Sequence, residues 1–291
     1  MKRNVEKLEA YLLMLNKLII DIHTMKQNIY QVDAFTDRVF GGNPAAVCPL
    51  KSWLSDTLLQ QIAMENNLAE TAFYVREDNH YQIRWFTPTI EVDLCGHATL
   101  AAAFVLFHLD GHTGDRIQFQ SPMSGALSVT RDGDWLTLDF PADRVEEVPL
   151  TEALIRGLSI KPVLAYKGRT DYLLVYDSEE AVKNVIPNFD PISKLDARGI
   201  IITAPGTSVD FVSRFFAPQS GVDEDPVTGS AHTTLIPYWS QRLNKSSLTA
   251  RQLSKRGGYL KCEEQGERVA ISGQARLYMI GDLNLDADLA L

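Results

Sequence analysis

The pattern of apolar and polar positions predicts short strands separated by a few helices. Strand-like runs occur at Ile29–Phe35, Thr71–Val75 and Tyr81–Phe86, each of a length typical of strands. Before the second run, Ser55 is a candidate N-cap for a helix. The apolar residues expected on one face of that helix are Leu58, Leu59, Ile62, Ala63 and Met64.

A second helix is predicted from about Ala98 to Leu109. Its residues are apolar nearly all round from Leu100 to Phe107, which indicates a helix enclosed by protein rather than one lying on a surface. Three strands are then predicted to complete the unit, at Ile117–Gln120, Leu127–Thr130 and Trp135–Phe140.

The second half of the chain repeats this order of elements. Its first strands are predicted at Tyr172–Tyr176, Ile200–Thr203 and Phe211–Phe216. A helix follows from about Ala231 to Leu243, and the last strands are Arg251–Ser254, Tyr259–Cys262 and Val269–Gly273.

A shared motif supports an internal repeat. Phe86–Pro88 and Phe216–Pro218 each precede a step of glycine, a polar residue and alanine that opens a helix. Laying Gly96 on Gly229, an offset of 133, continues without a gap into these pairs: Ser121 with Ser254, Gly125 with Gly258, and Leu136 with Val269. An ungapped match that extends past a short motif favours two copies of one structural unit.

The predicted fold class is therefore α/β, of the α+β type, in two similar domains over residues 27–143 and 144–291. Each domain is expected to be a curled, mostly antiparallel sheet around a central helix. A cleft is expected between the starts of the two central helices.

Composition limits the classes of partner and cofactor. The chain has 291 residues, a formal net charge of -9 and a pI near 5.2, so nucleic acid and anionic membrane surfaces are not expected partners. Its three cysteines, Cys48, Cys95 and Cys262, are too few and too scattered for a disulfide framework or a metal site. A cytoplasmic location is expected, with no metal.

Residues 1–26 differ from the rest of the chain. Leucine and isoleucine residues between Leu8 and Ile20 follow basic residues, but polar residues interrupt the run and no cleavage site follows. We therefore predict a peripheral amphipathic helix rather than a signal peptide or a membrane span. Met25 directly precedes the first strand, so the segment is interpreted as an extension from an upstream, non-native start codon.

Six short motifs carry a family resemblance, in this order: Asp33–Phe35, Gly42–Pro44, Glu70–Phe73, Phe86–Pro88, Gly96–Thr99 and Glu224–Ser230. In these motifs the chain resembles the PhzF-like (phenazine biosynthesis) isomerase family, which has the diaminopimelate-epimerase fold. The resemblance runs from about Gln27 to Asp282. It implies an isomerase and a homodimer.

The resemblance also implies a site. In the family's best-understood members, a glutamate moves a proton between carbons of a cyclic dihydro-hydroxyanthranilate, with no metal or organic cofactor. The position that resembles this glutamate is Glu70. The residues that resemble its companions are His97, Asp225 and Ser230, with the Gly42-Asn43 turn as part of the same site.

The residues around Glu70 suit that role. Glu70 lies between Leu68-Ala69 and the apolar strand Thr71–Val75, where loss of water would raise the pKa of its carboxyl group. Proton transfer at carbon needs such a base, with a pKa near the working pH and a position in a cleft that excludes water.

The two predicted helix starts are candidates for binding an anion. Gly96-His97 and Gly229-Ser230 occupy equivalent positions in the two copies. Backbone N–H groups at a helix N-terminus favour a negative charge, and glycine allows a ligand to approach closely. We therefore expect both starts to bind the carboxylate of a small substrate.

Asp225 is distinguished from its acidic neighbours by Pro226, which favours an extended backbone before the glycine turn. It is expected to hydrogen-bond the substrate or His97. Asp223 and Glu224 are expected to be solvated.

Relatives that racemise amino acids use two cysteines, one from each half. Cys95 stands at one of these positions, but its counterpart is Thr228, whose hydroxyl is far too weak a base. One-base chemistry by Glu70 is therefore favoured over chemistry with two thiols. In the second copy, Arg169 or Thr170 is expected at the place of Glu70.

The sequence thus predicts a cofactor-independent isomerase acting on a small carboxylate, expected to be cyclic, with Glu70 as acid and base. Two alternatives stay open. One is a racemase that uses Glu70 and His97 as opposed acid and base. The other is a non-catalytic protein that binds a small carboxylate on the same fold.

Overall fold

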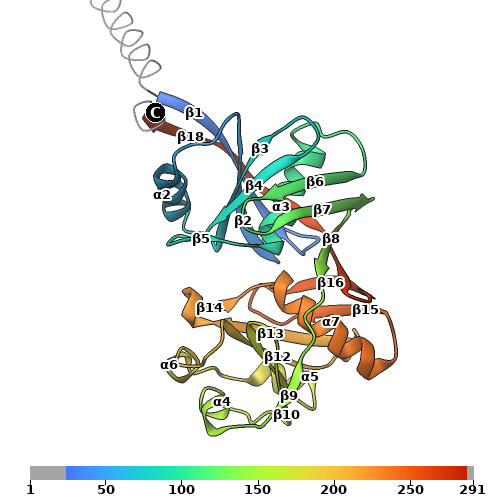
Figure 1. The fold of residues 1–291 in the computed structure, drawn as a ribbon. Helices are drawn as coiled ribbons and strands as arrows, with labels where there is room; N and C mark the ends of the chain where they lie inside the picture. The colour runs from blue at the N-terminus through green and yellow to red at the C-terminus, as the bar shows by residue number, and fades with distance from the viewer. Residues whose placement is uncertain (1–23, 287–291) are drawn as a thin grey trace, which may run out of the picture.

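The computed structural model describes residues 24–286, which form two lobes placed end to end (Figure 1). The predicted helix within residues 1–26 lies almost wholly outside the described residues. Between residues 24 and 286, no helix is long and apolar enough to cross a membrane.

The first lobe is built mainly from the N-terminal half of the chain. Its elements are β1 (Thr24–Ala34), β2 (Asn43–Leu50), α2 (Asp56–Asn66), β3 (Glu70–Arg76), β4 (Tyr81–Phe86), β5 (Glu91–Val92), α3 (Gly96–His108), β6 (Arg116–Ser121), β7 (Gly125–Asp132) and β8 (Trp135–Pro141). The last strand of the chain, β18 (Ala275–Asp286), returns to this lobe and pairs with β1 along its length. From sequence, these residues were expected in the second domain.

The second lobe follows the same plan with extra short elements. It contains β9 (Glu146–Val148), α4 (Glu152–Arg156), β10 (Leu164–Lys167), β11 (Asp171–Val175), α5 (Glu179–Asn184), α6 (Phe189–Ile192), β12 (Gly199–Pro205), β13 (Phe211–Ala217), the 3-10 turn η1 (Pro218–Ser220), β14 (Val222–Asp225), α7 (Gly229–Leu243), β15 (Ser247–Gln252), β16 (Gly258–Gln265) and β17 (Arg268–Gly273).

The strand registers of the two lobes correspond. In the first lobe, Val129 of β7 pairs with Leu138 of β8. In the second lobe, Cys262 of β16 pairs with Ile271 of β17. Each residue of the second pair lies 133 positions after its counterpart in the first pair. The match fails at β15. There Gln252 pairs with Gly258, whereas Ser121 pairs with Gly125 in the first lobe.

The predicted pairing of Ser121 with Ser254 is therefore wrong. The turn between β15 and β16 is longer than the turn between β6 and β7, so β15 is displaced by two residues. In the second lobe, Gln252 occupies the strand position that corresponds to Ser121 of the first lobe, and Ser254 lies in the turn. This displacement brings a buried glutamine to the boundary between the lobes, where it contacts the site described below.

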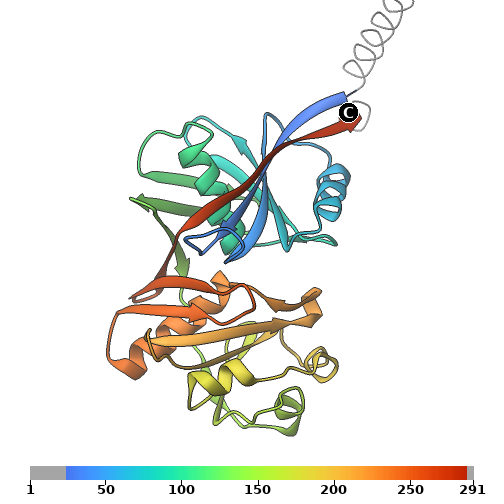
Figure 2. The ribbon, with the colours of Figure 1, turned by 180° about the vertical axis from the view of Figure 1, so that it is seen from behind.

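The local patterns of the helices are largely as predicted. Ser55 caps α2 and accepts a hydrogen bond from the backbone N–H of Leu58. Met64 does not face the core, since it is 57% exposed. Helix α3 is buried on nearly all sides, as its apolar sequence predicts. Both views show α3 and α7 enclosed by strands, one in each lobe (Figures 1 and 2).

The lobes are joined by strand pairing and by a common core. Strands β8 and β17 pair from Arg268 opposite Pro141 to Gly273 opposite Leu136. One cluster of buried apolar side chains includes residues of both central helices, Leu100 and Leu235 among them. The two helix starts meet where the lobes meet.

Candidate active site

The turn before β2 places an amide side chain between the lobes. Gly42 has a φ of +61°, and a Cβ built there would lie 2.0 Å from the carbonyl oxygen of Ala34, so only glycine fits. The Gly42 N–H donates to the carbonyl of Gly257 at 2.8 Å. The next residue, Asn43, begins β2 and is fully buried.

Glu70 is the first residue of β3 and lies beside Ala45 of β2 in a parallel pairing. Its side chain is 17% exposed. Burial, and then the negative charge of Asp225, raise the pKa of the Glu70 carboxyl group to about 8. The carboxyl group therefore titrates near neutral pH, as expected for a general acid and base.

His97, the second residue of α3, contacts Glu70. Its Nε2 lies 3.2 Å from Oε2 of Glu70, and the ring is 4% exposed. Burial lowers the pKa of His97 to about 3, so the ring is neutral at physiological pH. Both atoms are buried, and neither has another hydrogen-bond partner in the described part of the chain, so each keeps unused hydrogen-bonding capacity.

Asn43 connects the two lobes at this point. Its Nδ2 donates to Oδ1 of Asp225 at 2.8 Å and to the carbonyl of Val227 at 2.9 Å. The same nitrogen lies 3.2 Å from Nδ1 of His97. Because both amide hydrogens are engaged, we assign the contact with His97 as packing. Asn43 thus lies between Asp225 and His97, and these two residues make no direct hydrogen bond with each other.

Asp225 is the last residue of β14, and its second oxygen accepts a hydrogen bond from the hydroxyl of Thr228. Burial raises the pKa of Asp225 to about 6, opposed by the hydrogen bonds from Thr228 and Asn43. Asp225 and Glu70 are therefore two carboxyl groups that both hold protons more tightly than usual.

The starts of α3 and α7 touch each other. A Cβ built on Gly96 would lie 3.4 Å from the Cα of Gly229, and a Cβ on Gly229 would lie 3.4 Å from the Cα of Gly96. No side chain caps either helix through a hydrogen bond. A carboxylate cannot fit between the two glycines, so it would bind beside the paired helix starts, where Ser230 is half-buried.

Cys95 lies next to this cluster, with Sγ 3.4 Å from Nδ1 of His97. Glu70, Cys95 and His97 present ligand atoms within 4.8 Å of one another and form the group best placed to hold a metal ion. However, burial raises the pKa of Cys95 well above its usual value, which opposes the thiolate that a metal would need.

Two site residues were missed from sequence. The buried side chain of Gln252 donates to the carbonyl of Asp225 at 2.8 Å and to the hydroxyl of Thr228 at 3.1 Å. It also accepts from the Thr228 N–H at 2.9 Å. Its polar side chain in an otherwise alternating strand was the available signal, but the ungapped repeat assigned Ser254 instead.

Arg198 is the second missed residue. It lies just before β12, where its Nε donates to Asp171 at 3.0 Å. Burial raises the pKa of Glu70 and of Asp225, and the positive charge of Arg198 opposes both shifts. The guanidinium is already paired with Asp171 through two nitrogens, so its positive charge acts on Glu70 and Asp225 only as a minor electrostatic effect.

The structure corrects two expectations near the site. The counterpart of Glu70 is Gly199, because Asp171 pairs with Gly199 as Ala45 pairs with Glu70; Arg169 and Thr170 instead precede β11. Glu224 is not a solvated loop residue. It forms a two-pronged ion pair with Arg214, at 2.7 Å and 3.0 Å.

His232, which sequence alone does not connect to any acid, is fully buried inside α7. Its Nδ1 lies 2.8 Å from the carbonyl of Thr228, and its ring packs near Phe211. The ring therefore has a structural position. The three cysteines are free and buried.

Comparison with known proteins identifies the family. The model of a family described as phenazine biosynthesis-like protein (PhzC-PhzF) matches residues 32–281. A protein of Pseudomonas aeruginosa named as an uncharacterized isomerase is 56% identical over 262 residues, which cover 90% of this chain and 100% of that protein.

Solved structures show the same fold. A crystal structure of a PhzF-family phenazine biosynthesis protein from Enterococcus faecalis has a TM-score of 0.87 at 48% identity, and covers 90% of this chain and 100% of that one. A hydroxyproline epimerase from Agrobacterium vitis, 11% identical, has a TM-score of 0.61 over 91% of this chain and 94% of that one; this likeness concerns the fold alone. The predicted epimerase-like α/β fold class is confirmed.

Proposed function

The chain belongs to the phenazine biosynthesis-like (PhzC-PhzF) family and is an isomerase, and we propose that it moves a proton between carbons of a small carboxylate, with Glu70 as acid and base. The observation that carries this proposal is the environment of one carboxyl group. Glu70 is largely buried, its pKa is raised to about 8, and its Oε2 lies 3.2 Å from a neutral histidine.

In the proposed reaction, the ionised form of Glu70 takes a proton from a carbon next to an electron-withdrawing group. The C–H bond breaks, its electron pair moves into the conjugated system of the substrate, and Glu70 becomes a carboxylic acid. The acid then returns the proton to a different carbon, which shifts a double bond. Neutral His97 stays beside the carboxyl group in both states and holds its orientation.

The substrate carboxylate is proposed to bind beside the helix starts at Gly96 and Gly229, near the Ser230 hydroxyl. Backbone N–H groups at these helix starts stabilise negative charge, including the charge that develops during proton removal. Asp225 would be held in place by Asn43 and Thr228.

The geometry argues against a racemase that uses Glu70 and His97. Opposed acid and base must lie on either side of one carbon, and a separation of 3.2 Å leaves no room for that carbon. The two-thiol alternative is disfavoured because Thr228 stands at the position of the second thiol. Its hydroxyl is far too weak a base and donates its hydrogen to Asp225. The isomerase names of the relatives favour an enzyme over a non-catalytic binder.

Exchange of solvent deuterium tests the proposal. The full chain is incubated in heavy water with small cyclic and acyclic carboxylates, including dihydro-hydroxyanthranilate, and the label is followed by mass spectrometry. We expect label at one carbon of one compound, with a rate that rises with pH towards about 8 as Glu70 ionises. Glu70→Gln should lower that rate by about 10²- to 10⁴-fold, the usual contribution of a general base.

Glu65→Gln is the matched control, because it makes the same substitution at an exposed position of α2. Its rate should equal that of the unaltered protein. Equal exchange with Glu70→Gln and Glu65→Gln would place the base elsewhere, with Cys95 as the next residue to test.

A further inference from the structure

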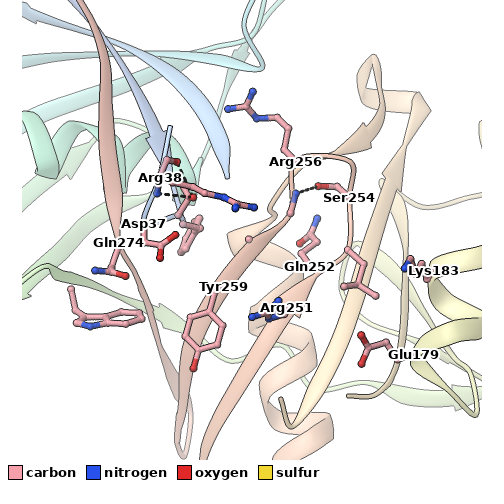
Figure 3. Close-up of a pocket in the computed structure, with 16 residues that line it drawn as sticks. Asp37, Arg38, Glu179, Lys183, Arg251, Gln252, Ser254, Arg256, Tyr259 and Gln274 are labelled. Atoms are coloured by element: carbon pink, nitrogen blue, oxygen red, sulfur yellow. Dashed lines mark hydrogen bonds between the residues drawn. The ribbon is translucent and has the colours of Figure 1, made fainter. Parts of the chain in front are cut away.

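A cleft lies between the lobes, apart from the cluster around Glu70 (Figure 3). Its volume is about 710 Å³, within the range of small-molecule sites. Neither Glu70, His97 nor Asp225 lines it. The lining residues from the first-lobe side include Asp37, Arg38 and Gln274, and those from the second lobe include Lys183, Arg251 and Tyr259.

The lining is basic, although the whole chain carries a net charge of -9. Four cationic side chains, Arg38, Lys183, Arg251 and Arg256, face two carboxylates, Asp37 and Glu179. Figure 3 shows Arg38 extending from the end of β1 towards the segment that carries Gln252, with Lys183 and Glu179 on the opposite wall. Positive charge gathered in a cleft concentrates anions there.

The four cations differ in how they are paired. Arg256 is held by Asp33 at 2.7 Å. In the part of the chain that the structure describes, Arg38, Lys183 and Arg251 make no ion pair, while Glu179 already accepts hydrogen bonds from Thr207. These hydrogen bonds lower the pKa of Glu179, and the charges of Arg251 and Lys183 help to lower it. Arg38, Lys183 and Arg251 are exposed and come from both lobes. Set against Asp37 and Glu179 in the same lining, they leave a small excess of positive charge, which an anionic ligand would offset.

The wall of this cleft also supports the proposed active site. Gln252 lines the cleft and bonds Asp225 and Thr228. Arg256 donates to the carbonyl of Gly42 at 2.8 Å, directly before Asn43. A ligand that orders the segment 252–258 would therefore hold both sides of the active site in place.

We infer that this cleft binds a small molecule with two or more negative charges, separately from the substrate, and that its occupancy stabilises the arrangement of Asn43 and Asp225. The shared chemistry is that of a phosphate or a polycarboxylate. Arg38 and Arg251 recognise the anion, since guanidinium groups suit both. The site does not depend on the proposed isomerisation.

Calorimetric titration of the full chain with inorganic phosphate and with citrate, at low ionic strength, tests binding. We expect saturable binding of one ion per chain. The dissociation constant of the double variant Arg38→Gln/Arg251→Gln should be at least about tenfold higher, because two charge-assisted contacts are lost. Arg76→Gln, an exposed change outside the cleft, should bind as the unaltered chain does. Should the double variant not fold, Lys183→Gln is expected to weaken binding too.

Amide hydrogen exchange tests the link to the active site. The N–H groups of Gly42 and Thr228 bond Gly257 and Gln252 in the cleft wall. If the opening motion that exposes these N–H groups also destroys the anion site, their exchange should slow about tenfold when the phosphate concentration is ten times its dissociation constant. Binding of phosphate alone assigns a phosphate-bearing ligand, and binding of citrate alone a polycarboxylate. No saturable binding of either ion, or equal binding by the double variant, overturns the site; binding without slower exchange overturns the link.

Discussion

At the scale of single residues, burial of the Glu70 carboxyl group disfavours its ionised form. Burial raises its pKa from 4.5 to about 8. Below about pH 4.5 both the folded and the unfolded chain hold this proton, so ionisation does not affect stability. Between about pH 4.5 and 8 the folded chain keeps the proton and the unfolded chain releases it. The contribution of this group to stability is therefore lost as the pH rises through that window.

Glu70→Gln should remove this pH dependence. The free energy of unfolding of the variant, relative to the unaltered protein, is expected to rise between pH 5 and pH 8 by at least about 1.4 kcal/mol, the equivalent of one pKa unit. Urea titrations at the two pH values measure it. Glu65→Gln, at an exposed position, should show no such rise. Parallel pH curves for Glu70→Gln and the unaltered protein would contradict a buried, proton-holding carboxyl group.

The identities of the site residues could be predicted from short motifs, whereas their partners could not. Glu70, His97 and Asn43 each stand in a local motif that sequence alone displays. The bond from Asn43 to Asp225 joins residues 182 positions apart, and no local pattern reports such a contact. For the same reason, the bond from Asn43 to Asp225 was not foreseen: Asp225 was expected to bond the substrate or His97, and Gln252 was not expected at all.

At the scale of elements, α3 and α7 meet through two glycines. Neither Gly96 nor Gly229 needs a positive φ. The two glycines allow a close approach of the helix starts, since a Cβ added to either would lie 3.4 Å from the opposite Cα. Such a distance is just tolerable for one methyl group. Two methyl groups at the same contact would have to push the helix starts apart.

A double-mutant cycle tests this contact. Gly96→Ala and Gly229→Ala should each change the free energy of unfolding by about 1 kcal/mol or less. Together they should destabilise the protein by about 1 kcal/mol more than their sum, because residues in contact are not additive. Urea titrations of the four proteins give the coupling. The control cycle combines Gly96→Ala with Gly133→Ala. Gly133 lies in a distant turn with open space around it, so the two changes in unfolding free energy should simply add. Additive losses in the first cycle would contradict the contact.

Element prediction succeeded where a segment's own pattern determines its structure. Helix α3 is apolar all round and is buried, and Ser55 caps α2. It failed where another segment determines the structure. Strand β18 exists because β1 pairs with it, and its own residues gave no prediction. Strand β15 is displaced because the turn after it is longer than its counterpart.

At the scale of the whole molecule, the largest buried apolar cluster spans both lobes, and each lobe adds a smaller cluster of its own. The same apolar cluster contains Trp85 and Leu100 of the first lobe and Trp239 of the second. Strands β8 and β17 pair across the boundary, and β18 then returns to β1. A chain that crosses between lobes in this way cannot lose one lobe and keep the packing of the other, so both should unfold in one cooperative transition.

Leu100→Ala provides the test, because Leu100 is fully buried in α3. Removing a buried leucine side chain costs about 2–5 kcal/mol. If the lobes unfold together, the most protected amides of β4 in the first lobe and of β12 in the second should lose equal protection against hydrogen exchange. Ile186→Ala, at a position 72% exposed, should change neither. Loss of protection in β4 with β12 unchanged would mean that the lobes unfold separately. In that case the active site, which has residues from both lobes, would be assembled by docking of two independently stable units.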